Sequence, residues 1–156
     1  ASLSALRRII ASGTFALPPF GSDDGLFPGT ARRGRLEGPL ADDEDVRFTL
    51  AVLYSALLSA ACIRDLPPAG TVVLDGNFVV DPLYGAIVTA LLPDRRVLVS
   101  RSTTGTATGA AMLAAHEERI SPVPLAAEAP DISDLPDLSS HQRRWQALAK
   151  TMEQTS

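Results

Sequence analysis

The stretch Thr71–Ala115, TVVLDGNFVVDPLYGAIVTALLPDRRVLVSRSTTGTATGAAMLAA, decides the fold predicted for this chain of 156 residues. Two short apolar runs, VVL at 72–74 and VLV at 97–99, have the composition of buried strands. Asp81-Pro82 predicts a helix start, because Asp caps a helix and Pro fits its first turn. A second helix is expected over residues 106–118. The order strand, helix, strand, helix predicts an α/β fold with neighbouring parallel strands.

Helices are predicted on both sides of this stretch. Residues 2–12 are predicted to form a short helix. The longest helix is predicted over residues 43–65, and it begins at the acidic run Asp42–Asp45. It is expected to be central because it is apolar nearly all round. Residues 121–138 are rich in Pro and Asp and predict an extended strap. A docking helix is predicted over residues 139–156 and starts at a capping box, Ser139 and Gln142. The chain therefore divides into a first unit, residues 1–120, followed by the strap and this helix.

Between the first two helices, a long loop rich in Gly and Pro is expected. Residues 14–18 are predicted to be extended, and residues 20–40 to be irregular and functional, because long structureless loops are uncommon in compact domains. The single cysteine, Cys62, falls in the apolar helical run and is expected to be a buried thiol.

Composition narrows the classes of partner. The net charge of −4 gives no broad attraction to nucleic acid or to an anionic membrane. One cysteine and the absence of a recognisable signal peptide favour a reducing, cytoplasmic location. The apolar run Phe48–Ile63 is shorter than the roughly 20 residues that a membrane span needs, which favours a core helix. The start at Ala1 is consistent with a processed terminus or with a piece of a larger protein.

Two glycine turns follow the predicted strands and therefore lie at one edge of the sheet, where ligands of α/β folds usually bind. In the first turn, Gly76 permits positive φ or close approach of a ligand, and Asn77 offers an amide. In the second, Gly105 precedes a helix N-terminus, which favours anions. Two plain interpretations stay open: the first turn binds nothing, and Gly109 serves only helix–sheet packing.

We identify no catalytic set and no metal ligand in the sequence. His116 and His141 are far apart and have no cysteine partner or metal-ligand spacing. The nucleophile elbow GxSxG is absent. Asp23 and Asp24 lie in the Gly-rich loop and are expected to be surface carboxylates.

The two turns resemble the C-terminal, nucleotide-binding domain of FGGY carbohydrate kinases. The segment 75–81, DGNFVVD, is similar to the family's adenosine motif, with Gly76 at its first glycine, Asn77 in place of the second and Asp81 in place of a common Asn. The segment 106–111, TATGAA, is similar to the family's next motif. The helix around Tyr54 and the Phe27-Pro28-Gly29 loop also resemble family elements. The closest likeness is to a divergent branch related to fuculokinase-like and rhamnulokinase-like proteins.

This resemblance implies the later part of a ribonuclease-H-like (actin-like ATPase) domain, with a βαβα core, a long central helix and a C-terminal docking helix. ATP with magnesium (Mg²⁺) would donate a phosphate to a sugar hydroxyl. The residues expected to line the nucleotide site are Gly76, Asn77, Phe78, Asp81, Gly105 and Thr106. The sugar and the catalytic base would lie mostly on an N-terminal domain that does not precede Ala1, so the chain alone is expected to be inactive.

Two other classes of protein remain open. One is a kinase-like module that binds a partner or forms a homodimer without catalysis. The other is an unrelated α/β binding domain that has acquired similar turns.

Overall fold

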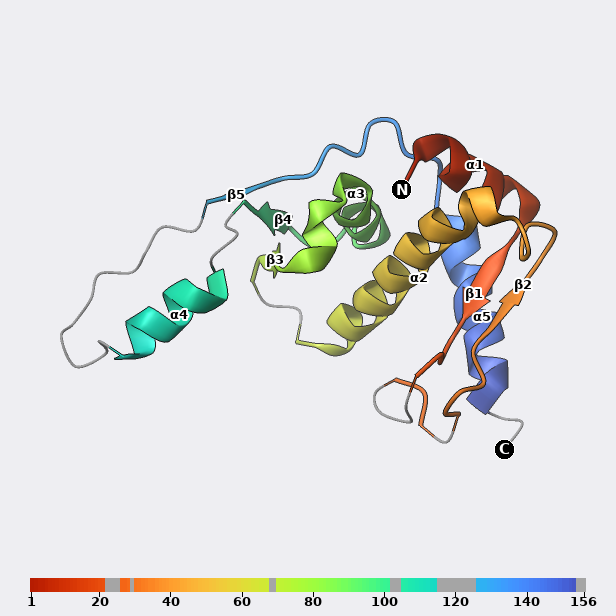
Figure 1. Cartoon of the computed structure of the whole chain (residues 1–156), viewed down its shortest axis with the longest axis horizontal. Helices are drawn as coiled ribbons and strands as arrows, with labels where there is room; N and C mark the ends of the chain where they lie inside the picture. The colour runs from red at the N-terminus through yellow and green to blue at the C-terminus, as the bar shows by residue number, and fades with distance from the viewer. Residues whose placement is uncertain (22–25, 29, 68–69, 102–104, 115–125, 154–156) are drawn as a thin grey trace.

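Two small sheets and five α-helices make up the part of the chain that the computed structural model describes, namely residues 1–21, 26–28, 30–67, 70–101, 105–114 and 126–153 (Figure 1). The elements, in chain order, are α1 (Leu3–Ser12), β1 (Phe15–Leu17), β2 (Arg35–Glu37), α2 (Glu44–Asp65), β3 (Val72–Leu74), the 3-10 helix η1 (Asn77–Val80), α3 (Pro82–Leu91), β4 (Val97–Ser100), α4 (Gly105–Ala114), β5 (Ala127–Glu128) and α5 (Ser139–Glu153).

The larger sheet confirms the predicted βαβα order. Its strand order is β3-β4-β5, and β3 runs parallel to β4 with Val72 opposite Val97 and Leu74 opposite Val99. The strand β5 pairs with β4 in the antiparallel direction. The parallel pair and the connecting helix α3 place the ends of β3 and β4 at the same edge, as the sequence predicted.

The long helix α2 is central, also as predicted. It packs against α1, α3 and β1, and the residues on its inner face are almost fully buried. By length and composition it is the one described helix that is long and apolar enough to cross a membrane, a test that core helices of soluble proteins also pass.

The prediction that Cys62 is buried is wrong, because one apolar face of α2 is exposed. The Cys62 side chain is exposed, and Phe48, on the same helical face, is 64% exposed. Residues 48 and 62 are four helical turns apart, so they point in similar directions away from α1, α3 and β1. An apolar composition therefore did not reveal which face the fold leaves uncovered.

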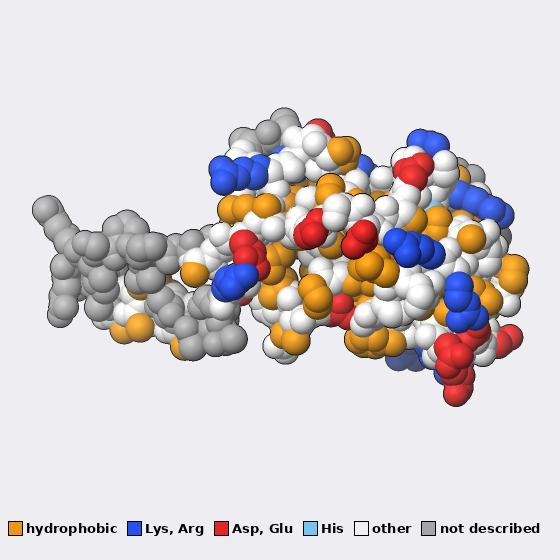
Figure 2. Space-filling model, turned by 90° about the horizontal axis from the view of Figure 1, so that it is seen from above, with side chains coloured by type: hydrophobic (Ala, Val, Ile, Leu, Met, Phe, Trp, Pro, Cys, Tyr) orange, Lys and Arg blue, Asp and Glu red, His pale blue; other side chains and the backbone are white. Residues whose placement is uncertain are grey.

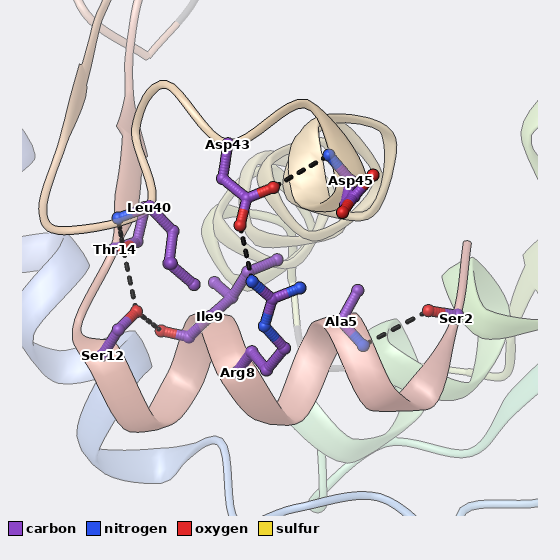
Figure 3. Close-up of polar contacts among 9 residues, drawn as sticks. All are labelled: Ser2, Ala5, Arg8, Ile9, Ser12, Thr14, Leu40, Asp43 and Asp45. Carbon is purple, nitrogen blue, oxygen red and sulfur yellow. Dashed lines mark hydrogen bonds and ion pairs between the residues drawn. The ribbon is translucent and has the colours of Figure 1, made fainter.

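Short polar contacts fasten α1 to the start of α2 (Figure 3). The hydroxyl of Ser2 accepts the Ala5 amide at 3.2 Å and caps α1. Asp43 caps α2 by accepting the Asp45 amide at 2.9 Å, and its other oxygen accepts the Arg8 guanidinium at 2.5 Å. The predicted acidic helix start is therefore confirmed, and the same carboxylate also joins the two helices.

Two local predictions need correction. The region 20–40 is not wholly irregular, because β2 pairs with β1 in the antiparallel direction; its sequence, Arg-Leu-Glu, is exposed or half-buried and lacks an apolar strand signal. At the start of α5, Asp137 rather than Ser139 supplies the cap: the Asp137 carboxylate accepts both the amide and the hydroxyl of Ser139.

The C-terminal helix α5 docks on β1 (Figure 1), which confirms its predicted role. Trp145 is 2% exposed, and its indole N–H donates to the Ala16 carbonyl at 2.8 Å. His141 stacks on Phe15 with ring centroids 4.3 Å apart. The C-terminal helix thus closes the core beside the N-terminal strand.

We expect Gly38→Ala to destabilise the fold by about 2–4 kcal/mol. Gly38 has φ of +110°, and an added Cβ would lie 2.7 Å from the Thr14 Cα and 2.8 Å from the Gly13 carbonyl oxygen. The neighbouring atoms are backbone, so they cannot rotate away. Urea unfolding measures the loss. Gly70→Ala is the matched control, because Gly70 also has positive φ, +87°, but open space around it; an equal loss in both variants would show that the contact contributes nothing.

Candidate functional site

The two predicted glycine turns come together at one edge of the larger sheet. Asp75 follows β3, and Gly105 begins α4 after β4. A Cβ built on Gly105 would lie 2.6 Å from the Asp75 carboxylate oxygen Oδ2. The carboxylate of the first turn therefore lies against the backbone of the second. Asp75, which the sequence analysis treated only as part of a turn, is the residue that joins them.

Gly76 makes the first turn in a conformation that requires glycine. Its φ is +91° and its ψ is −165°, and no heavy atom lies within 4 Å of a Cβ built there. Asn77 then begins η1 and is exposed. The backbone at Gly76 is therefore open to a close approach from outside, as the sequence predicted for this position.

Phe78 presents an exposed aromatic ring beside this turn. The ring is 61% exposed, and its centroid lies 5.4 Å from that of the buried Tyr84 on α3. The Tyr84 hydroxyl is within 2.9 Å of the Ser59 hydroxyl on α2. Phe78 thus rests on a side chain that the core holds in place, which makes it a suitable surface for stacking a flat ring. The sequence analysis did not single out Tyr84, because its apolar helical setting looks like ordinary core.

Asp81 has the capping role that the sequence predicted for it. Its Oδ1 accepts the Leu83 amide at 2.9 Å, and its Oδ2 accepts the amino group of Ala1 at 2.5 Å. It also lies on the wall of a cavity of about 340 Å³ between the start of α3 and the chain around Asp134. Its Oδ1 is occupied by the first turn of α3, which sets Asp81 apart from the open turn at Gly76.

The helix α4 does not pack against the sheet as predicted. Figure 1 shows it lying apart from the other elements. Gly109 is exposed and no heavy atom lies within 4 Å of a Cβ built on it, so the predicted packing role is wrong. Small residues permit close packing, but none of the described elements covers this helix. Thr106 lies in its first turn, directly after Gly105.

Exposed apolar side chains lie on β3 and on η1, beside the first turn. Val73 is 40% exposed and Val80 82%, in addition to Phe78. The strand β3 pairs only with β4 among the described residues, so its other edge is open. On the face drawn in Figure 2, acidic and basic side chains are interspersed among apolar ones. Exposed apolar groups around an open strand edge are typical of surfaces that contact another segment or chain.

Several other sequence candidates lie elsewhere. Asp23, Asp24, Gly29 and His116 fall outside the described residues. Among the residues that the structure describes, no group of three His, Cys, Asp or Glu side chains is placed to hold a metal ion. Phe27, from the loop that resembles a family element, lies edge-on to Trp145 with ring centroids 6.2 Å apart.

These features define an α/β domain whose two glycine turns meet at one edge of its larger sheet. Residues 1–122 match the family model described as "Carbohydrate kinase FGGY, C-terminal domain", so the chain belongs to this family. A family model that spans most of the chain rules out an unrelated α/β domain. The match ends before α5, which begins at Ser139.

A similar solved structure has the same fold. It is a carbohydrate kinase from Novosphingobium aromaticivorans, with a TM-score of 0.71 and 22% sequence identity. The likeness covers 96% of this chain and 30% of that chain, so the present sequence corresponds to less than a third of the larger protein. No curated protein matches the chain significantly.

Proposed function

We propose that this chain is the nucleotide-binding part of a carbohydrate kinase that transfers the γ-phosphate of ATP to a sugar hydroxyl. The observation that carries the proposal is the meeting of the Gly76 turn and the Gly105 turn at one sheet edge in a member of the FGGY family. The likeness to fuculokinase-like and rhamnulokinase-like proteins remains part of this proposal.

The residues present at this edge fit an adenosine group. Gly76 leaves open space above the backbone, and the exposed ring of Phe78 rests on Tyr84. A purine would stack on the Phe78 ring, and the Asn77 amide would hydrogen-bond the base or the ribose. Gly105 and Thr106 begin a helix, whose N-terminal amides favour phosphate oxygens. Asp81 would act indirectly, by fixing the start of α3.

The phosphoryl transfer itself would need groups from outside this chain. Mg²⁺ usually binds nucleotide phosphates through few protein carboxylates, and it would supply charge neutralisation during transfer. A catalytic base for the sugar hydroxyl would come from a preceding domain. We therefore expect the chain alone to bind nucleotide without phosphorylating sugars. ATP-dependent sugar phosphorylation by the purified chain would contradict this division of roles.

We expect Gly76→Val to weaken ATP and ADP binding about tenfold or more, because a β-branched side chain is strained at positive φ and would fill the open space above the turn. Isothermal titration calorimetry, with the chain and with the complete kinase, measures the change. Gly70→Val is the matched control: Gly70 also has positive φ and open surroundings, but precedes β3 instead of following it. Equal affinity in the wild type and the Gly76 variant would remove this turn from the site.

One observation favours a second function, a non-catalytic interaction or dimerisation module. The exposed side chains Val73, Phe78 and Val80 lie on β3 and on η1, which follows it, and one edge of β3 is unpaired among the described residues. The same surface would serve to bind a second copy. Sedimentation equilibrium distinguishes the two functions: a mass well above 16.4 kDa without nucleotide binding supports the module, and a monomer that binds ATP supports the kinase part.

A further inference from the structure

A second cavity lies between the Phe27 loop, the C-terminal end of α2 and α5. Its volume is about 300 Å³, at the lower end of the range for small-molecule sites. It sits at the opposite end of α3 from the glycine turns, because Arg64 on its wall bonds the Leu91 carbonyl, whereas Asp81 begins that helix. Much of its wall comes from α5, which lies beyond the residues that the family model matches.

Aromatic rings form one side of this cavity. Trp145 and Phe27 meet edge to face, at an interplanar angle of 86°. The Trp145 indole N–H is already bonded to Ala16, so no polar atom of this ring needs a partner in the cavity. Ala61 and Ala149 line the same space and keep it open because their side chains are small. The accessible part of this wall belongs mainly to Phe27, because Trp145 is 2% exposed, so a ligand ring would stack on Phe27 and touch Trp145 only at its edge.

Two cationic side chains, one from each helix, reach the same cavity. Arg64 comes from α2 and Lys150 from α5. The Nη2 of Arg64 donates to the Leu91 carbonyl at 2.6 Å and to the Gln142 Oε1 at 3.4 Å, which fixes the guanidinium. Arg64 makes no ion pair with any described residue. The Lys150 ammonium also makes no ion pair with a described carboxylate. Asp65 lines the rim as well, so the three charges sum to one positive charge.

We propose that this cavity binds a small aromatic carboxylate. The ring of the ligand would lie against Phe27 and Trp145, and its carboxylate would pair with Arg64 and Lys150. Asp65 would disfavour ligands with two negative charges. Nothing in the proposed kinase chemistry uses this cavity, so each of the two proposals can be tested independently of the other.

The test uses the fluorescence of Trp145, the only tryptophan in the chain. The probe is 3-phenylpropionate, excited with light that only indole absorbs. Its neutral amide, 3-phenylpropanamide, tests the need for charge, and propionate tests the need for the ring. We expect a saturable change with 3-phenylpropionate and at least about tenfold weaker binding of either control. No saturable change, or equal binding of the amide, would overturn the proposal.

Charge-neutral variants locate the bound carboxylate. We expect Arg64→Gln to weaken binding about tenfold, because its guanidinium is held in place, and Lys150→Gln about two- to fivefold. Arg47→Gln is the matched control, because Arg47 lies on the same helix but at its other end, where it pairs with Glu44. Since Arg64→Gln also removes a hydrogen bond to Leu91, its thermal unfolding is recorded alongside. Unchanged affinity in both Arg64→Gln and Lys150→Gln would contradict the assignment even if the probe binds.

Discussion

Trp145→Ala is expected to release α5 from β1 and to cost about 3–5 kcal/mol of unfolding free energy, with about 1–3 kcal/mol more from the unpaired Ala16 carbonyl. Trp145 is buried, fills the space beside Phe27 and donates the one indole hydrogen bond to β1. Domains of this size are stable by about 5–15 kcal/mol. A single truncation therefore removes a large share of the total. Urea unfolding followed by circular dichroism measures the loss.

Two further variants separate packing from hydrogen bonding. Trp145→Phe keeps most of the buried ring and removes the donor, so it should cost about 1–3 kcal/mol. Lys150→Ala, on the exposed face of the same helix, should change stability by less than about 0.5 kcal/mol. If Trp145→Ala costs no more than Lys150→Ala, α5 does not close the core. Limited proteolysis should then also find α5 equally protected in the wild type and the Trp145→Ala variant.

The stability of the fold is expected to fall as the pH drops from 7 to 4, because of His141. Burial, and secondarily the charge of Arg144, lowers the pKa of His141 from 6.5 to about 4. Its Nε2 is buried without a hydrogen-bond partner, so a proton there has no acceptor. A depressed histidine pKa means that the unfolded chain binds the proton first. The contribution is fully present above pH 6.5 and is lost progressively down to about pH 4.

Relative to pH 7, this linkage predicts that the free energy of unfolding is lower by about 2 kcal/mol at pH 5 and by about 3 kcal/mol at pH 4. Urea unfolding at a series of pH values measures it. His141→Phe should flatten the curve over this window, since a phenyl ring keeps the stacking on Phe15 without titrating. Hydrogen bonds from Ser133 and Ser139 lower the pKa values of Asp131 and Asp137. Any stability that is lost when these two carboxylates are protonated is therefore lost below about pH 4. The same slope in both proteins would exclude His141 as its source.

Helices and parallel strands were predictable because their signals are local. Asp81-Pro82 specifies the start of α3 by capping and by proline geometry, and Ser2 and Asp43 specify the starts of α1 and α2 in the same way. The predicted edge followed from the order of elements alone, because successive parallel strands must present the same ends. The contact between Asp75 and Gly105 is the physical result.

The failures arise where a partner distant in sequence decides the structure. The strand β2 forms because its backbone pairs with β1, although its own residues show no apolar alternation. Cys62 is exposed because, among the described elements, none covers that face of α2, and Gly109 is open because none of them covers α4. Tyr84 supports Phe78 only through the approach of two helices. No local sequence motif indicates any of these features.

The hydrogen bond between Trp145 and Ala16 also sets an order of events during synthesis. Its two residues are separated by 129 positions. Chains are made from the N-terminus, and contacts between distant residues form only after the intervening segment exists. The inner surface of β1 must therefore remain incompletely covered until residue 145, which follows it by 129 positions, has been translated. A ribosome that stalls before residue 145 would expose Phe15 and Leu17, which makes this interval the time at which the nascent protein most needs protection from aggregation.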